Sequence, residues 1–289
     1  MSTIVIDGFK LFKHLDGGMS IIINSDRIHE CMQFYKEKQL SGVVITTAFN
    51  YELQNVDFLA DYPEIKHLLI SDGIKDVSAV HALKKLNYLM LSGKNRKVDF
   101  INFPLLAKLN IVWSPHLTNL DTCTKLEEFV LRNYTPKNKD CSFISNITWL
   151  KQLVIIQSTL THLNGLEKLD RLEKLEFYYC SKLGTLDCLE TSKESLTYLF
   201  FDHCKSIINH EYVTRLHHLY TLAFNDCGAI PSIKFINTMP SLKDIRFMGT
   251  DVIDGDMTPC IGFKYAAFTN KRHFTHTMEQ IEMLSSAKL

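Results

Sequence analysis

Hydrophobic residues recur along most of the chain in one short pattern, in which positions one, four and six of a six-residue segment are apolar. Nine copies are clear: Ile65/Leu68/Ile70, Leu86/Leu89/Leu91, Leu106/Leu109/Ile111, Leu126/Phe129/Leu131, Leu150/Leu153/Ile155, Leu172/Leu175/Phe177, Leu196/Leu199/Phe201, Leu219/Leu222/Phe224 and Leu242/Ile245/Phe247. Weaker copies stand at the two ends, Leu40/Val43/Ile45 and Phe263/Ala266/Phe268. From Ile65 to Phe263, successive first positions lie 21, 20, 20, 24, 22, 24, 23, 23 and 21 residues apart. This period predicts a solenoid of about ten repeats, each with one short strand.

Further positions recur with the same period. Eight residues after the first leucine of three repeats stand Cys180, Cys204 and Cys227. Apolar pairs three residues apart close the return segments: Val77/Val80, Leu120/Cys123, Leu163/Leu166, Leu186/Leu189 and Ile233/Ile236. Such pairs favour a single turn of helix or 3-10 helix. Because one strand and its return cannot bury their own leucines, neighbouring repeats must stack and share a continuous core.

The repeat pattern also predicts how the chain is organised. Residues 1–39 are expected to form an N-terminal α/β cap, with strands at residues 4–6 and 21–23 and a helix from about Asp26, which Ser25 or Asp26 would cap. Residues 40–268 are expected to form the solenoid, and residues 269–289 a C-terminal cap or tail. Caps are needed because terminal repeats would otherwise expose apolar faces.

Two segments carry a resemblance to a known family, "LEKLDRLEKLEFYYCSKLGTLDCLE" and "IKDVSAVHALKKLNYLMLSG". Over about residues 40–268 the chain resembles leucine-rich-repeat proteins with the roughly 22-residue repeats of internalins. The resemblance implies an α/β solenoid of horseshoe shape, with about ten parallel strands on its concave face and helical or 3-10 returns. It also implies that the three cysteines occupy the family's asparagine-or-cysteine position. The ending "FKYAAFTNKRHFTHT" is similar to bacterial leucine-rich-repeat proteins that serve as immunity proteins against polymorphic toxins.

Charge and composition limit the classes of partner and the cellular compartment that we expect for this protein. Lys plus Arg and Asp plus Glu both number 32, so no net charge favours nucleic acid or an anionic membrane. The first residues lack the basic region of a signal peptide, and no apolar run approaches the ~18 residues of a spanning helix. We therefore expect a cytoplasmic protein that binds neither nucleic acid nor membrane and is a monomer when free. Its eight cysteines are expected to be reduced thiols that pack as small hydrophobic groups.

The alternation of side chains along each strand identifies a candidate binding surface. If the three apolar positions point inward, the residues between and just after them point to the concave face. Aromatic and arginine side chains are common interface hot spots. The candidates are Trp113, Arg132, Ile156, Glu176, Tyr178, Tyr179, Tyr198, Phe200, Asp202, Asp226, Asp244 and Arg246. Two other interpretations stay open: these are scattered surface hydrophobic residues, or the alternation slips in some repeats and buries them.

The C-terminal half of this face has an acidic bias. Glu176, Asp202, Asp226 and Asp244 stand against Lys174 and Arg246. Such a surface would suit a partner with a basic surface, such as a nuclease with a positive groove. An ordinary solvated mixture of charges explains the same residues equally well.

The sequence contains no P-loop, GxSxG, HExxH, GxGxxG or CxxC motif, and we predict no catalytic residue, metal site or cofactor. The leading hypothesis is a protein-binding module, specifically an inhibitor or immunity protein that neutralises a toxin. A regulatory or scaffold subunit that targets an enzyme without inhibiting it is the first alternative. An enzyme with an unrecognised site in its caps is the second.

Overall fold

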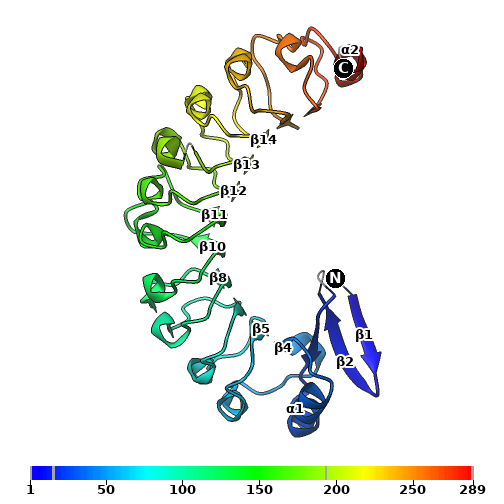
Figure 1. The fold of residues 1–289 in the computed structure, drawn as a ribbon, viewed down its shortest axis with the longest axis vertical. Helices are drawn as coiled ribbons and strands as arrows, with labels where there is room; N and C mark the ends of the chain where they lie inside the picture. The colour runs from blue at the N-terminus through cyan, green and yellow to red at the C-terminus, as the bar shows by residue number, and fades with distance from the viewer. Residues whose placement is uncertain (1, 15–16, 193, 288–289) are drawn as a thin grey trace. The chain divides into compact units, whose positions relative to one another are not determined.

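The computed structural model describes residues 2–14, 17–192 and 194–287, and the chain divides into two compact units, Met1–Phe129 and Val130–Leu289. In each unit the strands lie along one side and short 3-10 helices along the other (Figure 1). The strands are β1 (Ser2–Ile6), β2 (Phe9–Lys13), β3 (Met19–Ile22), β4 (Gly42–Ile45), β5 (His67–Ile70), β6 (Tyr88–Leu91), β7 (Val98–Asp99), β8 (Lys108–Val112), β9 (Leu117–Thr118), β10 (Glu128–Tyr134), β11 (Gln152–Ser158), β12 (Lys174–Tyr178), β13 (Tyr198–Asp202), β14 (Thr221–Asn225), β15 (Asp244–Phe247) and β16 (Tyr265–Phe268).

Helical structure consists of two α-helices and a series of short 3-10 turns. The α-helices are α1 (Ile28–Glu37) and α2 (Met278–Ser286). The 3-10 helices are η1 (Ser25–Arg27), η2 (Thr47–Phe49), η3 (Asp57–Asp61), η4 (Ser78–Ala82), η5 (Phe100–Asn102), η6 (Leu120–Thr122), η7 (Ser142–Ile144), η8 (Leu166–Lys168), η9 (Asp187–Ser192), η10 (His210–Arg215), η11 (Lys234–Thr238) and η12 (Thr258–Cys260). No helix in the described part of the chain has both the length and the apolar character needed to cross a membrane.

The first unit begins with structure that the repeat pattern does not contain. Strands β1, β2 and β3 are antiparallel neighbours, whereas β3 pairs with β4 in parallel. Strand β2, the second strand of this hairpin, was not predicted from the sequence. The predicted cap, Ser25 or Asp26, was wrong: the Asn24 side chain accepts a hydrogen bond from the Asp26 backbone N–H, and α1 begins at Ile28 without a side-chain cap. The 3-10 turn inserted before α1 moves the capping position back by one residue.

The repeat strands are parallel and in register in both units. In the first unit β4, β5, β6 and β8 pair in that order, and in the second unit β11 to β16 follow one another. Strand β10 contains residues of both units. Along the second unit the middle leucine position is aligned from strand to strand, as Leu153, Leu175, Leu199, Leu222, Ile245 and Ala266. The predicted parallel-strand solenoid is confirmed.

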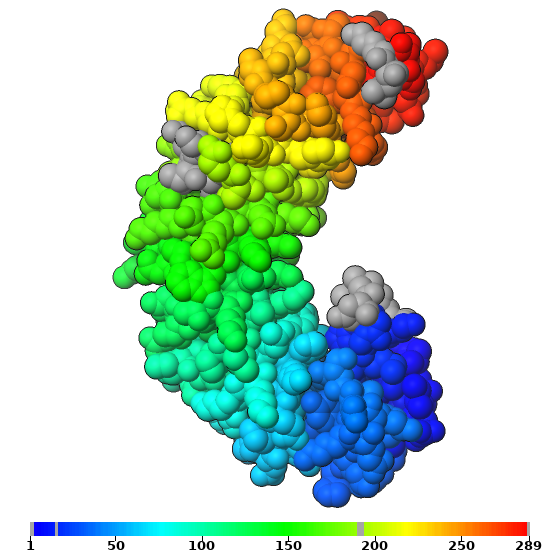
Figure 2. Space-filling model, in the orientation of Figure 1, coloured from blue at the N-terminus to red at the C-terminus, as the bar shows by residue number. Residues whose placement is uncertain are grey.

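The apolar positions form one spine within each unit. Leu175, Leu199 and Leu222 are fully buried. The Phe177 and Phe201 rings stack at 5.3 Å between centroids, and those of Phe201 and Phe224 at 5.2 Å. Each such side chain contributes roughly 1.5–3 kcal/mol of transfer free energy. In the second unit, residues of successive repeats form adjacent bands on the surface, from green through yellow to orange (Figure 2). Stability is therefore shared between neighbouring repeats.

Helix α2 packs against β16, the last repeat strand of the second unit. A capping box starts the helix: the Thr277 side chain accepts from the Gln280 backbone N–H, and the Gln280 side chain accepts from the Thr277 backbone N–H. Ile281 is buried, and the Ser285 hydroxyl accepts a hydrogen bond from the Gly262 backbone N–H at 2.9 Å. The assignment of residues 269–289 as a cap stays a prediction, and its last two residues lie outside the described part of the chain.

Candidate functional site

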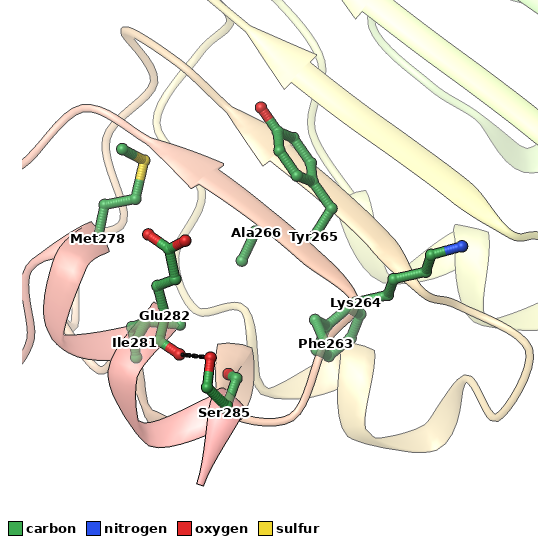
Figure 3. Close-up of a pocket in the computed structure, with 9 residues that line it drawn as sticks. Phe263, Lys264, Tyr265, Ala266, Met278, Ile281, Glu282 and Ser285 are labelled. Atoms are coloured by element: carbon green, nitrogen blue, oxygen red, sulfur yellow. Dashed lines mark hydrogen bonds between the residues drawn. The ribbon is translucent and has the colours of Figure 1, made fainter. Parts of the chain in front are cut away.

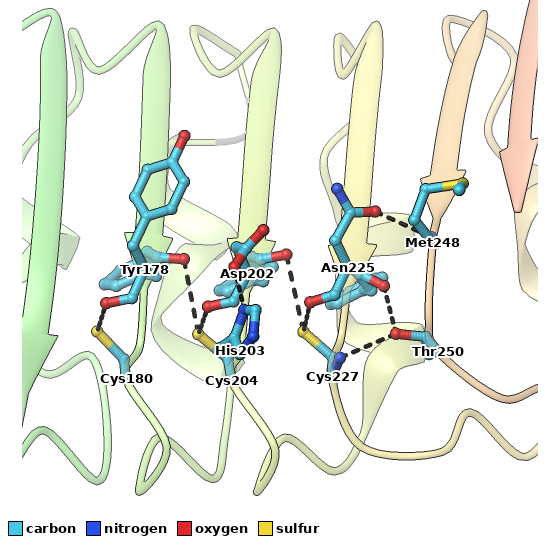
Figure 4. A network of polar contacts seen from close by, with 12 residues as sticks. Tyr178, Cys180, Asp202, His203, Cys204, Asn225, Cys227, Met248 and Thr250 are labelled. Carbon is cyan, nitrogen blue, oxygen red and sulfur yellow. Dashed lines mark hydrogen bonds and ion pairs between the residues drawn. The ribbon is translucent and has the colours of Figure 1, made fainter. Parts of the chain in front are cut away.

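A ladder of small polar side chains lies under the turns that leave the strands of the second unit (Figure 4). The thiols of Cys180, Cys204 and Cys227 each donate to a carbonyl of the preceding strand, those of Ile155, Phe177 and Phe201, with S···O distances of 3.8, 3.6 and 3.7 Å. The Thr250 hydroxyl makes the equivalent bond to the Phe224 carbonyl at 2.6 Å, and Ser158 bonds the Tyr134 carbonyl at 2.8 Å. These bonds hold each turn at the same height as its neighbour.

The residue just before each ladder position has a left-handed backbone. Tyr179, His203 and Asp226 have φ of 55°, 55° and 47°, and Gly249 has φ of 70°. Such values are uncommon for residues with a side chain, so each strand ends sharply here. The Tyr179 ring is 53% exposed and lies 4.5 Å from the His203 ring, centroid to centroid. Tyr179 therefore lies at the rim, beside the strands rather than on them.

The open face of the second unit is the strand surface opposite the spine, and its centre is an aromatic cluster of Tyr178, Tyr198 and Phe200. In the register of β12 and β13, Lys174 is opposite Tyr198, Glu176 is opposite Phe200, and Tyr178 is opposite Asp202. Ring centroids are 5.4 Å apart for Tyr178 and Phe200, and 6.2 Å apart for Tyr198 and Phe200, whose planes differ by 9°. All three rings are half-buried. The spine is complete without them, so their exposure is not a by-product of packing the core.

Carboxylates surround this cluster. The Tyr178 hydroxyl donates to Glu176 Oε2 at 2.6 Å, and burial together with this bond raises the pKa of Tyr178. Burial also raises the pKa of Tyr198. Both phenols therefore stay neutral hydrogen-bonding groups at physiological pH. Within the described residues, Glu176, Asp202 and Asp226 form no ion pair with lysine or arginine, although Asp202 contacts His203 Nδ1.

The positive charge of Arg246 on β15 is already paired with a carboxylate. Its Nε donates to Asp244 Oδ1 at 2.8 Å and its Nη2 donates to Asp244 Oδ2 at 2.6 Å. Its guanidinium also lies over the Tyr265 ring, 5.0 Å from the centroid. The hydrogen bonds to Asp244 raise the pKa of Arg246 further. Of the predicted site residues, Asp244 and Arg246 therefore balance each other's charge.

Between the aromatic cluster and this pair lies β14, where the alternation predicts outward side chains at Thr221 and Ala223. The register places these two residues between Tyr198 and Asp244 and between Phe200 and Arg246, respectively. Ala223 is nevertheless 0% exposed, and Thr221 is buried. Their small side chains lie beneath the larger ones on both neighbouring strands. The open face is thus continuous from β13 to β15, and the sequence analysis did not assign these two positions.

The remaining predicted residues fall in different places. Ile156 on β11 is opposite Tyr178 and extends the aromatic cluster by one strand. Arg132 lies on β10, and Asp226 is exposed at the rim beyond β14. Trp113 follows β8 and belongs to the first unit. The structure therefore brings together Ile156, Glu176, Tyr178, Tyr198, Phe200 and Asp202, and it adds Tyr265, whose position in a weak final repeat gave no clear signal.

A pocket of about 230 Å³ lies between β16 and α2 (Figure 3), lined by Phe263, Lys264, Tyr265, Ala266, Met278, Ile281, Glu282, Ser285 and Ser286. It lies at the end of the second unit and contains none of the residues that the sequence analysis proposed. Among the described residues, no three His, Cys, Asp or Glu side chains come close enough to hold a metal ion.

Parallel strands that alternate with 3-10 returns around a leucine spine define the leucine-rich-repeat fold. The solved structures with similar folds are consistent with this class. The chain resembles internalin C2 of Listeria monocytogenes, with a TM-score of 0.50 and 18% identity over 66% of this chain and 83% of that one. The predicted resemblance to internalin-like leucine-rich-repeat proteins is therefore confirmed at the level of the fold.

Two weaker similarities accompany it. InlJ of Listeria monocytogenes, whose functional domain includes a cysteine ladder, gives a TM-score of 0.38 and 18% identity over 82% of this chain and 65% of that one. A leucine-rich-repeat protein of Leptospira interrogans gives 0.46 and 14% identity over 81% and 73%. No family model and no curated protein matches the sequence. These comparisons concern the fold alone.

Proposed function

We propose that the protein binds a partner protein through the open face of the second unit. The observation that carries this proposal is the half-exposed aromatic cluster of Tyr178, Tyr198 and Phe200 on strands whose spine is already filled. Aromatic side chains ringed by polar groups dominate the energetics of many protein interfaces. The seven strands β10 to β16 at roughly 4.8 Å extend about 30 Å in the stacking direction. A standard interface of about 800 Å² per partner fits on such a surface.

We further propose that binding inhibits the partner, as an immunity protein in the cytoplasm inhibits a toxin with a basic surface. Two observations support this: the carboxylates Glu176, Asp202 and Asp226 without lysine or arginine partners among the described residues, and the resemblance of the ending "FKYAAFTNKRHFTHT". Complementary charge raises the association rate and excludes wrong partners. A scaffold subunit would bind through the same face and leave the partner's activity intact. An enzyme with a site in its caps would not need this face.

The first experiment tests the face. The double variant Tyr178→Ala/Phe200→Ala and the matched control Tyr220→Ala/Ile208→Ala are used as baits in a lysate of the native host. Tyr220 and Ile208 are exposed but are not on the open face. We expect the Tyr178→Ala/Phe200→Ala variant to lose the partner and the control to retain it. By calorimetry, the affinity of the Tyr178→Ala/Phe200→Ala variant for the partner should be at least about a hundredfold weaker than that of the unmodified protein. Equal retention by both baits, with unchanged circular dichroism, contradicts the proposed face.

The second experiment tests inhibition. Purified partner is assayed for toxicity in cells and for its activity in solution, with and without one equivalent of the protein. Inhibition predicts loss of both on one-to-one binding. A complex that forms while the partner's activity is unchanged supports the scaffold and rules out the immunity role.

A further inference from the structure

We propose that Glu176 and the aromatic cluster form a receptor for a guanidinium group, so that the partner inserts an arginine side chain at this point. The inference rests on the proposed binding function for the biological source of that arginine. It assigns a chemical class of ligand to one point on the open face.

The geometry supplies both elements of guanidinium recognition. The Phe200 ring lies 5.4 Å from the Tyr178 ring and 6.2 Å from the Tyr198 ring, centroid to centroid, and the planes of Phe200 and Tyr198 differ by 9°. The Glu176 carboxylate lies beside them, opposite Phe200 in the register, with Oε2 held by the Tyr178 hydroxyl. A planar cation can stack on a ring face while its N–H groups reach a carboxylate. The bond from Tyr178 holds that carboxylate in position before any ligand arrives.

The molecule itself contains an example of this arrangement. Three strands along the same face, Arg246 lies over the Tyr265 ring and donates two parallel hydrogen bonds to Asp244. That group has a carboxylate, an aromatic ring and the arginine. The Glu176 group has a carboxylate and three rings, but no arginine among the described residues contacts it. The chain thus shows that this open face can accommodate a guanidinium between an acid and a tyrosine.

The charges around Glu176 favour a cation from outside. Asp202 lies opposite Tyr178 and is negative, apart from its contact with His203. Two cations oppose these carboxylates. Arg246 acts on Tyr198 but is paired with Asp244. Lys174 is exposed two residues before Glu176 and forms no ion pair within the described part of the chain. An arginine is favoured over a lysine because its plane matches both the ring faces and the two carboxylate oxygens, and because it is more weakly hydrated. Removing Lys174 should therefore strengthen binding of the guanidinium.

The test uses the full chain and three nonapeptides, each with four arginines, four lysines or four citrullines separated by glycines. Calorimetry measures the affinity for each peptide, and carbon-detected NMR follows the tyrosine ring signals. We expect the arginine peptide to bind at least about fivefold more tightly than the lysine peptide and about tenfold more tightly than the citrulline peptide. The ring signals of Tyr178 and Tyr198 should shift first. Equal affinity for the arginine and citrulline peptides, or no binding of the arginine peptide, overturns the proposal. Equal affinity for arginine and lysine overturns the preference for a guanidinium.

Matched variants locate the effect. Glu176→Gln should weaken the arginine peptide at least about fivefold, whereas Glu173→Gln, an equal change of charge at an exposed residue off the open face, should change affinity less than about twofold. Lys174→Ala should tighten binding by about twofold. Equal weakening by both glutamate variants would show diffuse electrostatic attraction and overturn the site.

The outcome is separable from that of the proposed function. If Tyr178→Ala/Phe200→Ala abolishes binding of the native partner while the arginine peptide does not bind, the face is correct and the guanidinium site is wrong. If the peptide binds as expected while that double variant retains the native partner, the guanidinium site is real, but the native partner does not bind through the open face.

Discussion

The two units support their turns by different chemistry. In the second unit, repeats 21–24 residues apart place a thiol or hydroxyl at the same position of successive turns, where it bonds the preceding strand. In the first unit, the repeats from Ile65 to Leu126 are 20 or 21 residues apart, and the equivalent positions hold Gly73, Lys94 and Ser114, whose hydroxyl accepts from the His116 backbone N–H. There Arg96, only 7% exposed, donates to the carbonyls of Ile74, Lys75 and Ser92.

Arg96 requires space that a neighbouring side chain would occupy. A Cβ atom on Gly93, whose φ is 99°, would lie 2.3 Å from Arg96 Nη2. The ladder of the second unit instead places one small residue at each turn, at intervals of 22 to 24 residues. These longer repeats therefore let one small side chain per turn bond the preceding strand, whereas between the shorter repeats of the first unit one long side chain reaches several carbonyls.

The open faces differ in the same sense. In the first unit, Lys108 and Glu128 pair across strands at 2.7 Å, and the open face begins with the His14, His67 and Tyr88 rings. In the second unit, Glu176, Asp202 and Asp226 have no such cation among the described residues. Paired charges satisfy each other, whereas unpaired carboxylates are available to a partner. This contrast is why we place the binding site on the second unit.

The largest expected effect tests whether the two spines are equivalent. Leu89 in the first unit and Leu175 in the second occupy the same spine position and are both fully buried. Each leucine-to-alanine substitution should cost about 2–5 kcal/mol of unfolding free energy, from lost transfer energy and the cavity left behind. Denaturant titration of both variants measures the costs. An unchanged midpoint for either would contradict its place in the spine.

The next effect compares the two kinds of turn support. Arg96→Ala leaves several carbonyls without their charged donor and should cost about 3 kcal/mol, whereas Cys204→Ala removes only weak thiol bonds and should cost about 1 kcal/mol. Chemical denaturation gives both values, and Cys204→Ser, which keeps a donor, serves as the control. A larger loss for Cys204→Ala than for Arg96→Ala would reverse our account of the two units.

The third effect depends on pH and concerns a buried histidine of the second unit. His210 is 2% exposed, lies edge-on to Phe224 at 5.0 Å and occupies a position that Phe100 and Leu120 fill in the first unit. Burial lowers the pKa of His210 from 6.5 to about 4. Because the folded state disfavours the charged ring, stability is complete above pH 6.5 and is lost as the pH falls toward 4. Between pH 7.5 and 5 the loss should be about 2 kcal/mol.

His210→Leu should remove this part of the pH dependence, and His217→Leu, at an exposed histidine, should leave it in place. Thermal or urea unfolding across the pH range distinguishes them. If the two variants have the same pH profile, another group is responsible for the loss.

The hydrophobic period was sufficient to predict the repeats, because each strand must bury the same three positions against its neighbours. Leu175, Leu199 and Leu222 were identified as core from spacing alone, and the shared offset of Cys180, Cys204 and Cys227 identified them as one repeated position. Strand β2 and the Asn24 cap were missed because residues 1–39 have no repeat that could set their register. The periodic pattern does not extend into these residues, so local turn chemistry determines their strands and helix cap.

Only the tertiary structure decided how the open-face residues combine. The sequence places Glu176, Tyr178, Phe200 and Arg246 on one face, but it does not say which charges are paired. The register sets Asp244 opposite Tyr265, the Arg246 guanidinium lies over that ring and is joined to Asp244 by two hydrogen bonds, and Ala223 is buried. The stacking of Arg246 on Tyr265 and the burial of Ala223 depend on residues of neighbouring strands, whereas the bonds of Arg246 to Asp244 and of Tyr178 to Glu176 join residues two positions apart on one strand. Alternation along a strand determines the direction of a side chain, but which partner it contacts depends on the packed structure.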